Sequence, residues 1–219
     1  MKKYRVALIG SNGKMGTICL DEISNHKNLE IVAKVNKNDD LDAVLSKTKP
    51  DLAIEFTSSK SVYTNVKIIL KHKIKTIIGS SGLLPDQIDE IYDICKLNHI
   101  GVLLIPNFSL GMALIAKISY DFSKYYKDVF IFEYHHTKKV DTISGTARYC
   151  SKILNTSNIR SVRSDNFVAK HQITIAGEGE RIILDHETFD RQSFKKGLSI
   201  TLEKIFDLDH LIVGLENIL

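Results

Sequence analysis

The chain has 219 residues, 43% of them hydrophobic, and a net charge of +4 at pH 7. This is enough for one large or two modest domains with apolar cores, and so mild a charge gives no case for nucleic-acid binding. The sequence has no run of about 18 apolar residues that could span a membrane. The apolar run in the start MKKYRVALIG is too short for a signal peptide. The three cysteines are widely spaced, which favours buried free thiols, so we expect a cytoplasmic protein.

Short apolar strands alternate with helix-compatible segments over the first half of the chain. We expect strands near 4–9, 30–35, 52–56, 75–78 and 101–105, and helices near 15–25, 60–72 and 85–97. This alternation predicts an α/β fold with a Rossmann-like, doubly wound parallel sheet. We place this dinucleotide-binding domain at 1–108, with 200–219 as a candidate segment to rejoin it.

The pattern changes from about Val129 onward. We expect strands near 129–134, 167–176 and 180–187, and helices near 144–155 and 191–206. This mixture predicts an α+β domain with a mixed sheet and helices on one side. We place this second domain at 109–199.

A glycine-rich turn joins the first strand to the first helix. Its glycines, Gly10, Gly13 and Gly16, have the spacing that allows a tight turn and the close approach of a dinucleotide pyrophosphate. A glycine-rich turn that binds no nucleotide is the alternative. The candidate cofactor-binding residues of this turn are Gly10, Ser11, Asn12, Gly13, Lys14 and Met15.

The end of the second strand indicates the type of dinucleotide. An acidic residue there would bind the ribose 2′-OH of NAD, and a basic residue would accept the 2′-phosphate of NADP. Asn36, Lys37 and Asn38 follow Val35, and the acids Asp39 and Asp40 come only later. Lys37 is therefore a candidate phosphate partner, with a solvated surface lysine as the equal alternative.

The segment EYHHTKKVDTISGTA, residues 133–147, is dense in hydrogen-bond donors. His135, His136 and Lys139 lie on a predicted strand-to-helix loop, and Ser144 stands where a helix N-cap is expected. Backbone N–H groups at a helix start bind carboxylate or phosphate oxygens. Adjacent histidines point to opposite sides of an extended chain, and no cysteine or carboxylate stands at ligand spacing, so we expect no metal.

This segment resembles the signature loop of the 4-hydroxy-tetrahydrodipicolinate reductase family, E-x-H-H-x-x-K-x-D-A-P-S-G-T-A. Nine of the eleven fixed residues are present, Asp141 among them, and Thr142 and Ile143 replace the Ala-Pro pair. Four further stretches are similar to family motifs in the same order, and the chain resembles a short form. These stretches are GSNGKMG at 10–16, DLAIEFTS at 51–58, IIGSSG at 77–82 and PNFSLG at 106–111.

The resemblance implies an NADH- or NADPH-dependent oxidoreductase of lysine and diaminopimelate biosynthesis. It implies reduction of 4-hydroxy-tetrahydrodipicolinate, a small dicarboxylate, by a homotetramer. The resemblance also makes 109–199 the domain for substrate binding and oligomerisation. His135 or Lys139 is expected to supply a proton, since His135 would have an ordinary pKa of about 6.5. The implied substrate-binding residues are His136, Ser144, Gly145 and Thr146, and the further cofactor-binding residues are Gly79, Ser80, Ser81, Pro106, Asn107 and Phe108.

Two other functions stay open at this point. Another Rossmann oxidoreductase, acting on a small amino acid or aldehyde, would keep the first 100 residues and make no use of the histidine loop. A dinucleotide-binding sensor without catalysis would bind cofactor and turn nothing over; only the Thr142-Ile143 departure supports it.

Overall fold

The computed structural model describes residues 3–139 and 142–219, which form two compact units. One unit extends to Pro106 and includes Lys195–Leu219, and the other is Asn107–Phe194. Each unit has its own sheet and its own apolar core. The separate binding roles that the sequence suggests for the two parts stay a prediction.

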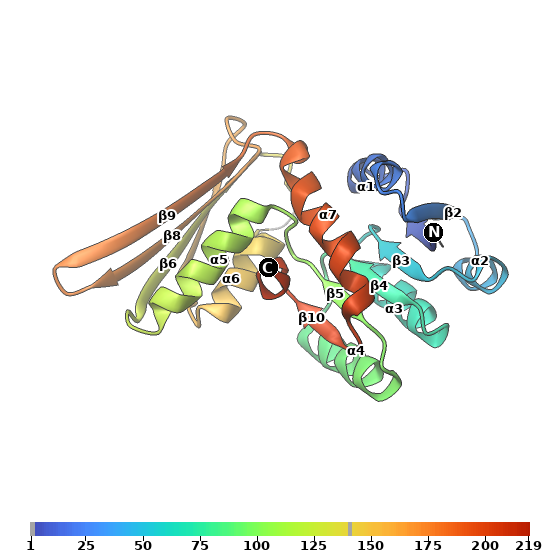
Figure 1. Ribbon diagram of the computed structural model, residues 1–219. Helices are drawn as coiled ribbons and strands as arrows, with labels where there is room; N and C mark the ends of the chain where they lie inside the picture. The colour runs from blue at the N-terminus through green and yellow to red at the C-terminus, as the bar shows by residue number, and fades with distance from the viewer. Residues whose placement is uncertain (1–2, 140–141) are drawn as a thin grey trace. The chain divides into compact units, whose positions relative to one another are not determined.

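The first unit contains a six-stranded parallel sheet in the order β10-β5-β4-β3-β1-β2 (Figure 1). This order reverses direction at β1, as in a doubly wound sheet. The elements are β1 (Tyr4–Ile9), α1 (Lys14–Asn25), β2 (Leu29–Val35), α2 (Leu41–Thr48), β3 (Leu52–Glu55), α3 (Val62–Lys71), β4 (Lys75–Ile78), α4 (Pro85–Asn98), β5 (Val102–Leu104), α7 (Lys195–Lys204), the 3-10 turns Ile205–Asp207 and Leu215–Ile218, and β10 (Leu211–Val213).

Helices cover both faces of this parallel sheet. Apolar side chains of α2, α3 and α4 pack with the strands in two buried clusters on one face. Right-handed crossovers place α1 on the other face, where α7 contacts it. The strands are therefore buried on both sides, and only their ends are available for ligands.

The second unit contains a four-stranded mixed sheet in the order β7-β6-β8-β9. β6 runs parallel to β7 and antiparallel to β8, and β8 is antiparallel to β9. The elements are α5 (Leu110–Ser123), β6 (Asp128–His135), α6 (Gly145–Ile153), β7 (Ile159–Arg163), β8 (Ala169–Gly177), β9 (Glu180–Thr188) and the 3-10 turn Arg191–Phe194.

Both helices of the second unit, α5 and α6, pack on the same face of its sheet; of these two, the sequence predicts only α6. The apolar core there joins α5 and α6 to alternate residues of β6 and β8, and its buried members are Met112, Ala116, Val129, Ile131, Ala147, Cys150, Leu154, Ile173 and Ile175. A tight turn at Glu178 and Gly179 joins β8 to β9. Gly179 has a φ of 78°, a conformation that favours glycine in such hairpins.

The structure also corrects the element predictions. It adds four elements that the sequence analysis missed, α2, α5, β7 and β10, and divides the predicted helix at 191–206 into a 3-10 turn and α7. α2, β7 and β10 have only 8, 5 and 3 residues. The missed signal for α5 is its cap, since the Ser109 hydroxyl accepts from the Met112 N–H at 3.3 Å.

Two expectations about composition can be compared with the structure. Cys19 and Cys95 are buried free thiols, as predicted, and Cys150 is buried as well. Among the helices in the described part of the chain, none is long and apolar enough to cross a membrane.

Candidate functional site

The glycine turn of the first unit brings two stretches of backbone close together. Gly10 follows β1 with a φ of 82°, and a Cβ there would lie 2.2 Å from the carbonyl oxygen of Phe56. Only glycine fits this position. The chain can therefore turn sharply at the carboxyl end of β1, where a parallel sheet binds its ligands.

The N-terminus of α1 is open to an anion. Gly13 is its N-cap, and none of the described side chains caps this end of the helix. Gly13 and Lys14 are exposed, and Met15 is half-buried. The uncapped N–H groups and the helix dipole fit a pyrophosphate.

Ser11 and Asn12 hold this turn against the end of β2. The buried Ser11 hydroxyl bonds the Asn36 side chain, and the Asn12 N–H donates to Asn36 Oδ1 at 3.1 Å. Sequence reasoning grouped both residues with the cofactor contacts. The structure gives the Ser11 hydroxyl and the Asn12 N–H a partner inside the protein, so these two groups shape the turn; a contact of either residue with the cofactor stays a prediction.

The acids that follow β2 have backbone partners. Asp39 accepts from the Asn36 N–H at 2.7 Å, and Asp40 caps α2 by accepting from the Ala43 N–H at 3.1 Å. Lys37 precedes both acids, in the exposed turn between Asn36 and Asp39. The basic group that the sequence singled out is therefore at the surface, at the end of β2.

The loop after β4 lies at the same edge of the parallel sheet. Gly79 donates its N–H to the carbonyl of Glu55 at 3.0 Å, and Ser81 is exposed. The Ser80 hydroxyl is buried, and it has no hydrogen-bond partner among the described residues. A buried unpaired hydroxyl is costly, so Ser80 is a donor that a ligand could satisfy.

The P-N-F element is divided between the two units. Pro106 is half-buried and ends the first part of unit one, whereas Asn107 and Phe108 belong to unit two. Phe108 is buried. The Asn107 amide donates to the Thr146 hydroxyl at 3.0 Å, and its oxygen accepts from the Ser109 N–H at 2.8 Å. Asn107 therefore connects the starts of α5 and α6.

A row of polar side chains crosses the inner face of the second sheet. Ser161 on β7, Glu133 on β6, His171 on β8 and His186 on β9 are cross-strand partners. The neighbouring row, which contains Ile131, is apolar. The inner face thus changes from apolar core to polar site within two residues.

This polar row holds the capping serines of both helices. The Ser144 N–H donates to both carboxylate oxygens of Glu133 at 3.1 Å, and its hydroxyl lies 3.2 Å from His171 Nε2. The Ser109 hydroxyl lies 2.9 Å from His186 Nε2. The two helix starts are therefore anchored to side chains of the sheet.

The N-terminus of α6 carries the predicted anion site. The Ser144 hydroxyl accepts from the Ala147 N–H at 3.1 Å, as an N-cap does. Gly145 and Thr146 form the first turn of the helix. Their N–H groups come before the first intrahelical donors, so they can bind a carboxylate.

Glu133 is a fully buried carboxylate. Burial by itself would raise its pKa, but hydrogen bonds from Ser144 and Ser161 and the charge of His135 outweigh burial and lower the pKa below its ordinary value. The Ser161 hydroxyl donates at 2.6 Å, and Arg163 Nη2 lies 3.5 Å from the same oxygen, Oε1. Glu133 is therefore ionised at neutral pH.

His135 lies beside this carboxylate and is only 7% exposed. Its Nδ1 is 3.7 Å from Glu133 Oε2, too far for a hydrogen bond, and has no hydrogen-bond partner in the described chain. Burial lowers its pKa to about 4; Glu133 opposes the shift, and Lys139 and Arg163 add to it. His135 is neutral near pH 7, so the expectation of an ordinary pKa is wrong.

The loop after β6 carries the other two donors. His136 and Lys139 are half-buried, and the Lys139 N–H donates to the His136 carbonyl at 3.1 Å. Asp165 fixes the loop, because it accepts from the backbone N–H and the hydroxyl of Thr137 at 3.1 and 2.6 Å. Asp141 of the signature lies outside the described residues.

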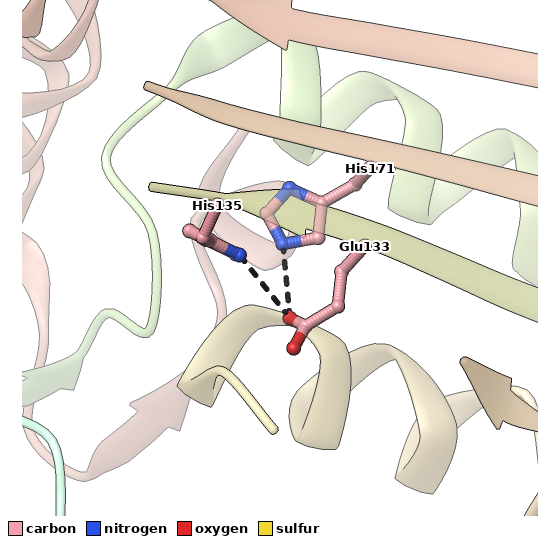
Figure 2. Close-up of side chains that lie close together, drawn as sticks. All are labelled: Glu133, His135 and His171. Carbon is pink, nitrogen blue, oxygen red and sulfur yellow. Dashed lines mark ion pairs between the residues drawn. The ribbon is translucent and has the colours of Figure 1, made fainter. Parts of the chain in front are cut away.

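Sequence reasoning missed His171. This residue is 3% exposed, and burial and the neighbouring His135 lower its pKa to about 3. Figure 2 shows both imidazoles directed at one oxygen of Glu133, Oε2, with distances of 3.7 and 3.8 Å. The missed signal is its alternation with the buried Ile173 and Ile175, which places it on the inner face of β8.

Glu133, His135 and His171 also have the composition of a metal site. One ligand-type atom from each lies within 4.8 Å of the others. Contrary to the expectation from the sequence, a carboxylate does lie near a histidine, because Glu133 stands beside His135. The absence of a metal stays a prediction; the donors that already bond Glu133 support it.

Comparison with known proteins follows the division of the chain. A family profile described as "Dihydrodipicolinate reductase, N-terminus" matches residues 4–108, and one described as "Dihydrodipicolinate reductase, C-terminus" matches 109–219. Together they cover almost the whole chain.

Similar proteins are known at nearly full length. The 4-hydroxy-tetrahydrodipicolinate reductase of Legionella pneumophila (strain Lens) is 32% identical over 242 residues, covering 99% of this chain and 100% of that protein. The enzyme of the same name from Coxiella burnetii (strain RSA 493 / Nine Mile phase I) is 31% identical, with 98% of each covered. The solved structure of dipicolinate-bound dihydrodipicolinate reductase from Paenisporosarcina sp. TG-14 is 26% identical, with a TM-score of 0.81 over 99% of this chain and 100% of that one.

Proposed function

The chain belongs to the dihydrodipicolinate reductase family, and from this premise we propose that it reduces 4-hydroxy-tetrahydrodipicolinate to tetrahydrodipicolinate, with release of water, in lysine and diaminopimelate biosynthesis. The observation that carries this proposal is the polar row under α6, where His135 and the helix start meet around Glu133. A sheet whose only task was to complete a core would continue its apolar rows there.

The first unit binds the nicotinamide cofactor. NADH or NADPH supplies a hydride when bound. Gly10 and Gly13 allow the pyrophosphate to approach the open start of α1, and the unpaired Ser80 hydroxyl is available to the cofactor. Because Asp39 and Asp40 bond backbone groups, Lys37 decides the preference, and NADPH is accepted at least as well as NADH.

The second unit binds the two carboxylates of the substrate. One carboxylate accepts from the N–H groups of Gly145 and Thr146 at the start of α6, and Lys139 and His136 add charge and hydrogen bonds. These contacts orient the ring for hydride addition. The dipicolinate bound in the Paenisporosarcina relative is a ring with two carboxylates of this class.

A proton completes the reaction. Hydride addition to the conjugated imine, formed when the 4-hydroxyl leaves as water, places negative charge on the substrate. His135 is neutral in the free protein. The bound anionic substrate raises the affinity of His135 for a proton, and only then can His135 donate one. Lys139 carries an ammonium group on the same loop and is the second proton donor.

One coupled assay tests this function. The substrate is generated in place by the preceding aldol condensation, and the absorbance of NADH or NADPH is followed after addition of the protein. We expect consumption that needs both the aldol product and this protein. Consumption with small amino acids or aldehydes instead, or cofactor binding without turnover, would overturn the proposal.

We also propose that the protein is a cytoplasmic homotetramer. The outer face of the second sheet exposes apolar side chains, among them Phe130, Val162 and Ile183. An apolar sheet face of this kind is suited to burial against another copy. Light scattering after size-exclusion chromatography should give four times the chain mass, and a monomer at micromolar concentration would exclude this assembly.

A further inference from the structure

Glu133 contacts two parts of the candidate site, the start of α6 and His135. Its two oxygens accept from the Ser144 N–H, the residue that caps α6. Its Oε2 also faces Nδ1 of His135 at 3.7 Å (Figure 2). Because Glu133 and His135 are two residues apart on β6, both side chains point to the inner face.

We infer that Glu133 is a positioning residue for the proposed reduction. Its carboxylate holds the anion-binding start of α6 and keeps a proton on Nδ1 of His135, so that Nε2 of His135 exchanges a proton with the substrate. This inference rests on the proposed function for its kinetic part. Its structural part, the tautomer of His135, can be measured without turnover.

The atoms around His135 Nδ1 favour this tautomer. Nδ1 is buried, and it has no hydrogen-bond partner in the described part of the chain. If Nδ1 carried a lone pair, that pair would face the ionised oxygen of Glu133, and the two would repel. A proton on Nδ1 turns the contact into an attraction, and a small approach then forms a hydrogen bond.

The other charged groups around His135 oppose its protonation. Lys139 and His136 are on the following loop, and Arg163 is on β7. The His171 ring lies on β8, edge-on to His135 with centroids 5.3 Å apart. Glu133 is the one group named here that favours the imidazolium.

A charge cycle follows from this arrangement. Without substrate, the cations and burial keep His135 neutral. A bound dicarboxylate neutralises Lys139 and the helix start, and His135 can then take a proton that Glu133 stabilises through Nδ1. Loss of the Glu133 charge should therefore reduce the protonated fraction of His135. The acid-dependent limb of the pH profile, which is the fall of kcat as pH rises and His135 loses its proton, should then move to lower pH.

The first experiment reads the tautomer in the wild-type protein. The protein is labelled with 15N-histidine, and two-bond 1H–15N spectra identify the protonated nitrogen of His135, assigned by comparison with His135→Gln. We expect a proton on Nδ1, both without ligand and with dipicolinate. A proton on Nε2 in the free protein would overturn the inference, whatever the enzyme turns over.

The second experiment reads the charge. Glu133→Gln keeps the size and one acceptor oxygen for Ser144 but removes the charge, so we expect kcat to fall about 100-fold, with the KM for the cofactor unchanged and the acid-dependent limb at lower pH. Asp121→Asn is the matched control: it removes an exposed carboxylate from α5 of the same unit, and kcat should stay within about threefold.

Glu133→Asp gives a second test, because it keeps the charge and withdraws it by one methylene. We expect an intermediate kcat and the wild-type position of the acid-dependent limb. Folded variants that keep the wild-type kcat and pH profile would overturn the inference. A wild-type protein without any turnover would instead contradict the proposed function and leave the tautomer measurement to decide the structural part.

Discussion

The two strand-to-helix junctions of this chain, β1 to α1 and β6 to α6, present a helix start in different ways. At the first, Gly13 is the N-cap and no side chain in the described residues makes a capping hydrogen bond. At the second, Ser144 caps the helix and the buried Glu133 lies behind it. A phosphate group needs close approach to bare backbone, whereas a reacting dicarboxylate needs side chains that also move a proton.

The largest expected effect is a loss of kcat on substitution at the second junction. His135→Gln keeps hydrogen bonding but cannot transfer a proton at neutral pH, so kcat should fall by about 100-fold to 10,000-fold with little change in cofactor affinity. Lys139→Met removes a charge beside a dianion, so it should lower kcat and raise the substrate KM together. Steady-state kinetics with both cofactors measures these effects. If both variants, folded and cofactor-competent, keep wild-type rates, the histidine loop is not the active site.

The next largest effect is a loss of dinucleotide affinity on substitution at the first junction. Gly13→Val keeps an ordinary backbone conformation, with φ at −76°, but places methyl groups over the open helix start. The dinucleotide Kd should rise about 100-fold, or about 2.7 kcal/mol, while the fold survives. Gly10→Ala is the contrasting variant, because its Cβ would collide with Phe56, and it should destabilise the fold itself. Unchanged titration of Gly13→Val with cofactor would remove this turn from the binding site.

A smaller effect at the first junction is expected on the selectivity between NADPH and NADH. Lys37→Ala should weaken NADPH about tenfold and leave NADH almost unchanged, because only NADPH carries the 2′-phosphate. Fluorescence titration with each cofactor measures this selectivity. Equal effects on the two cofactors would show that Lys37 does not contact the phosphate.

The smallest effect concerns pH and the second junction. The pKa values of His135 and His171 in the folded protein, about 4 and about 3, lie below the ordinary 6.5, so the unfolded chain binds more protons at pH 5. This stability is present above about pH 6.5 and is lost as pH falls toward 4. From pH 7.5 to 6 we expect Tm to fall by about 3–6 °C.

Hydrogen exchange can locate that loss. Peptides of β6 and α6 should lose protection at pH 5 before peptides of β1 and α1 do. His171→Asn, which cannot titrate in this range, should flatten the dependence of Tm on pH. An equally steep dependence in this variant would contradict a contribution from His171.

The sequence was sufficient for features that are local in the chain. The glycine turn and the capping serine at 144 depend on residues within one turn or one helix start. The polar row was not predictable in this way, because Ser161 and His171 meet Glu133 through strand pairing across 28 and 38 positions. The lowered pKa of His135 was missed for the same reason: it results mainly from burial, which depends on the packing of the whole unit.

The two-residue turn at Glu178 and Gly179 lies at the far end of the hairpin from the polar row. It nevertheless fixes which residues of β8 and β9 face each other, and side chains alternate between the faces of a strand. A shift of one residue in this pairing would turn His171 or His186 away from the capping serines while leaving both chemically intact. The length of a surface loop thus helps to determine the geometry of the candidate site, and we expect an insertion there to disturb that site at a distance.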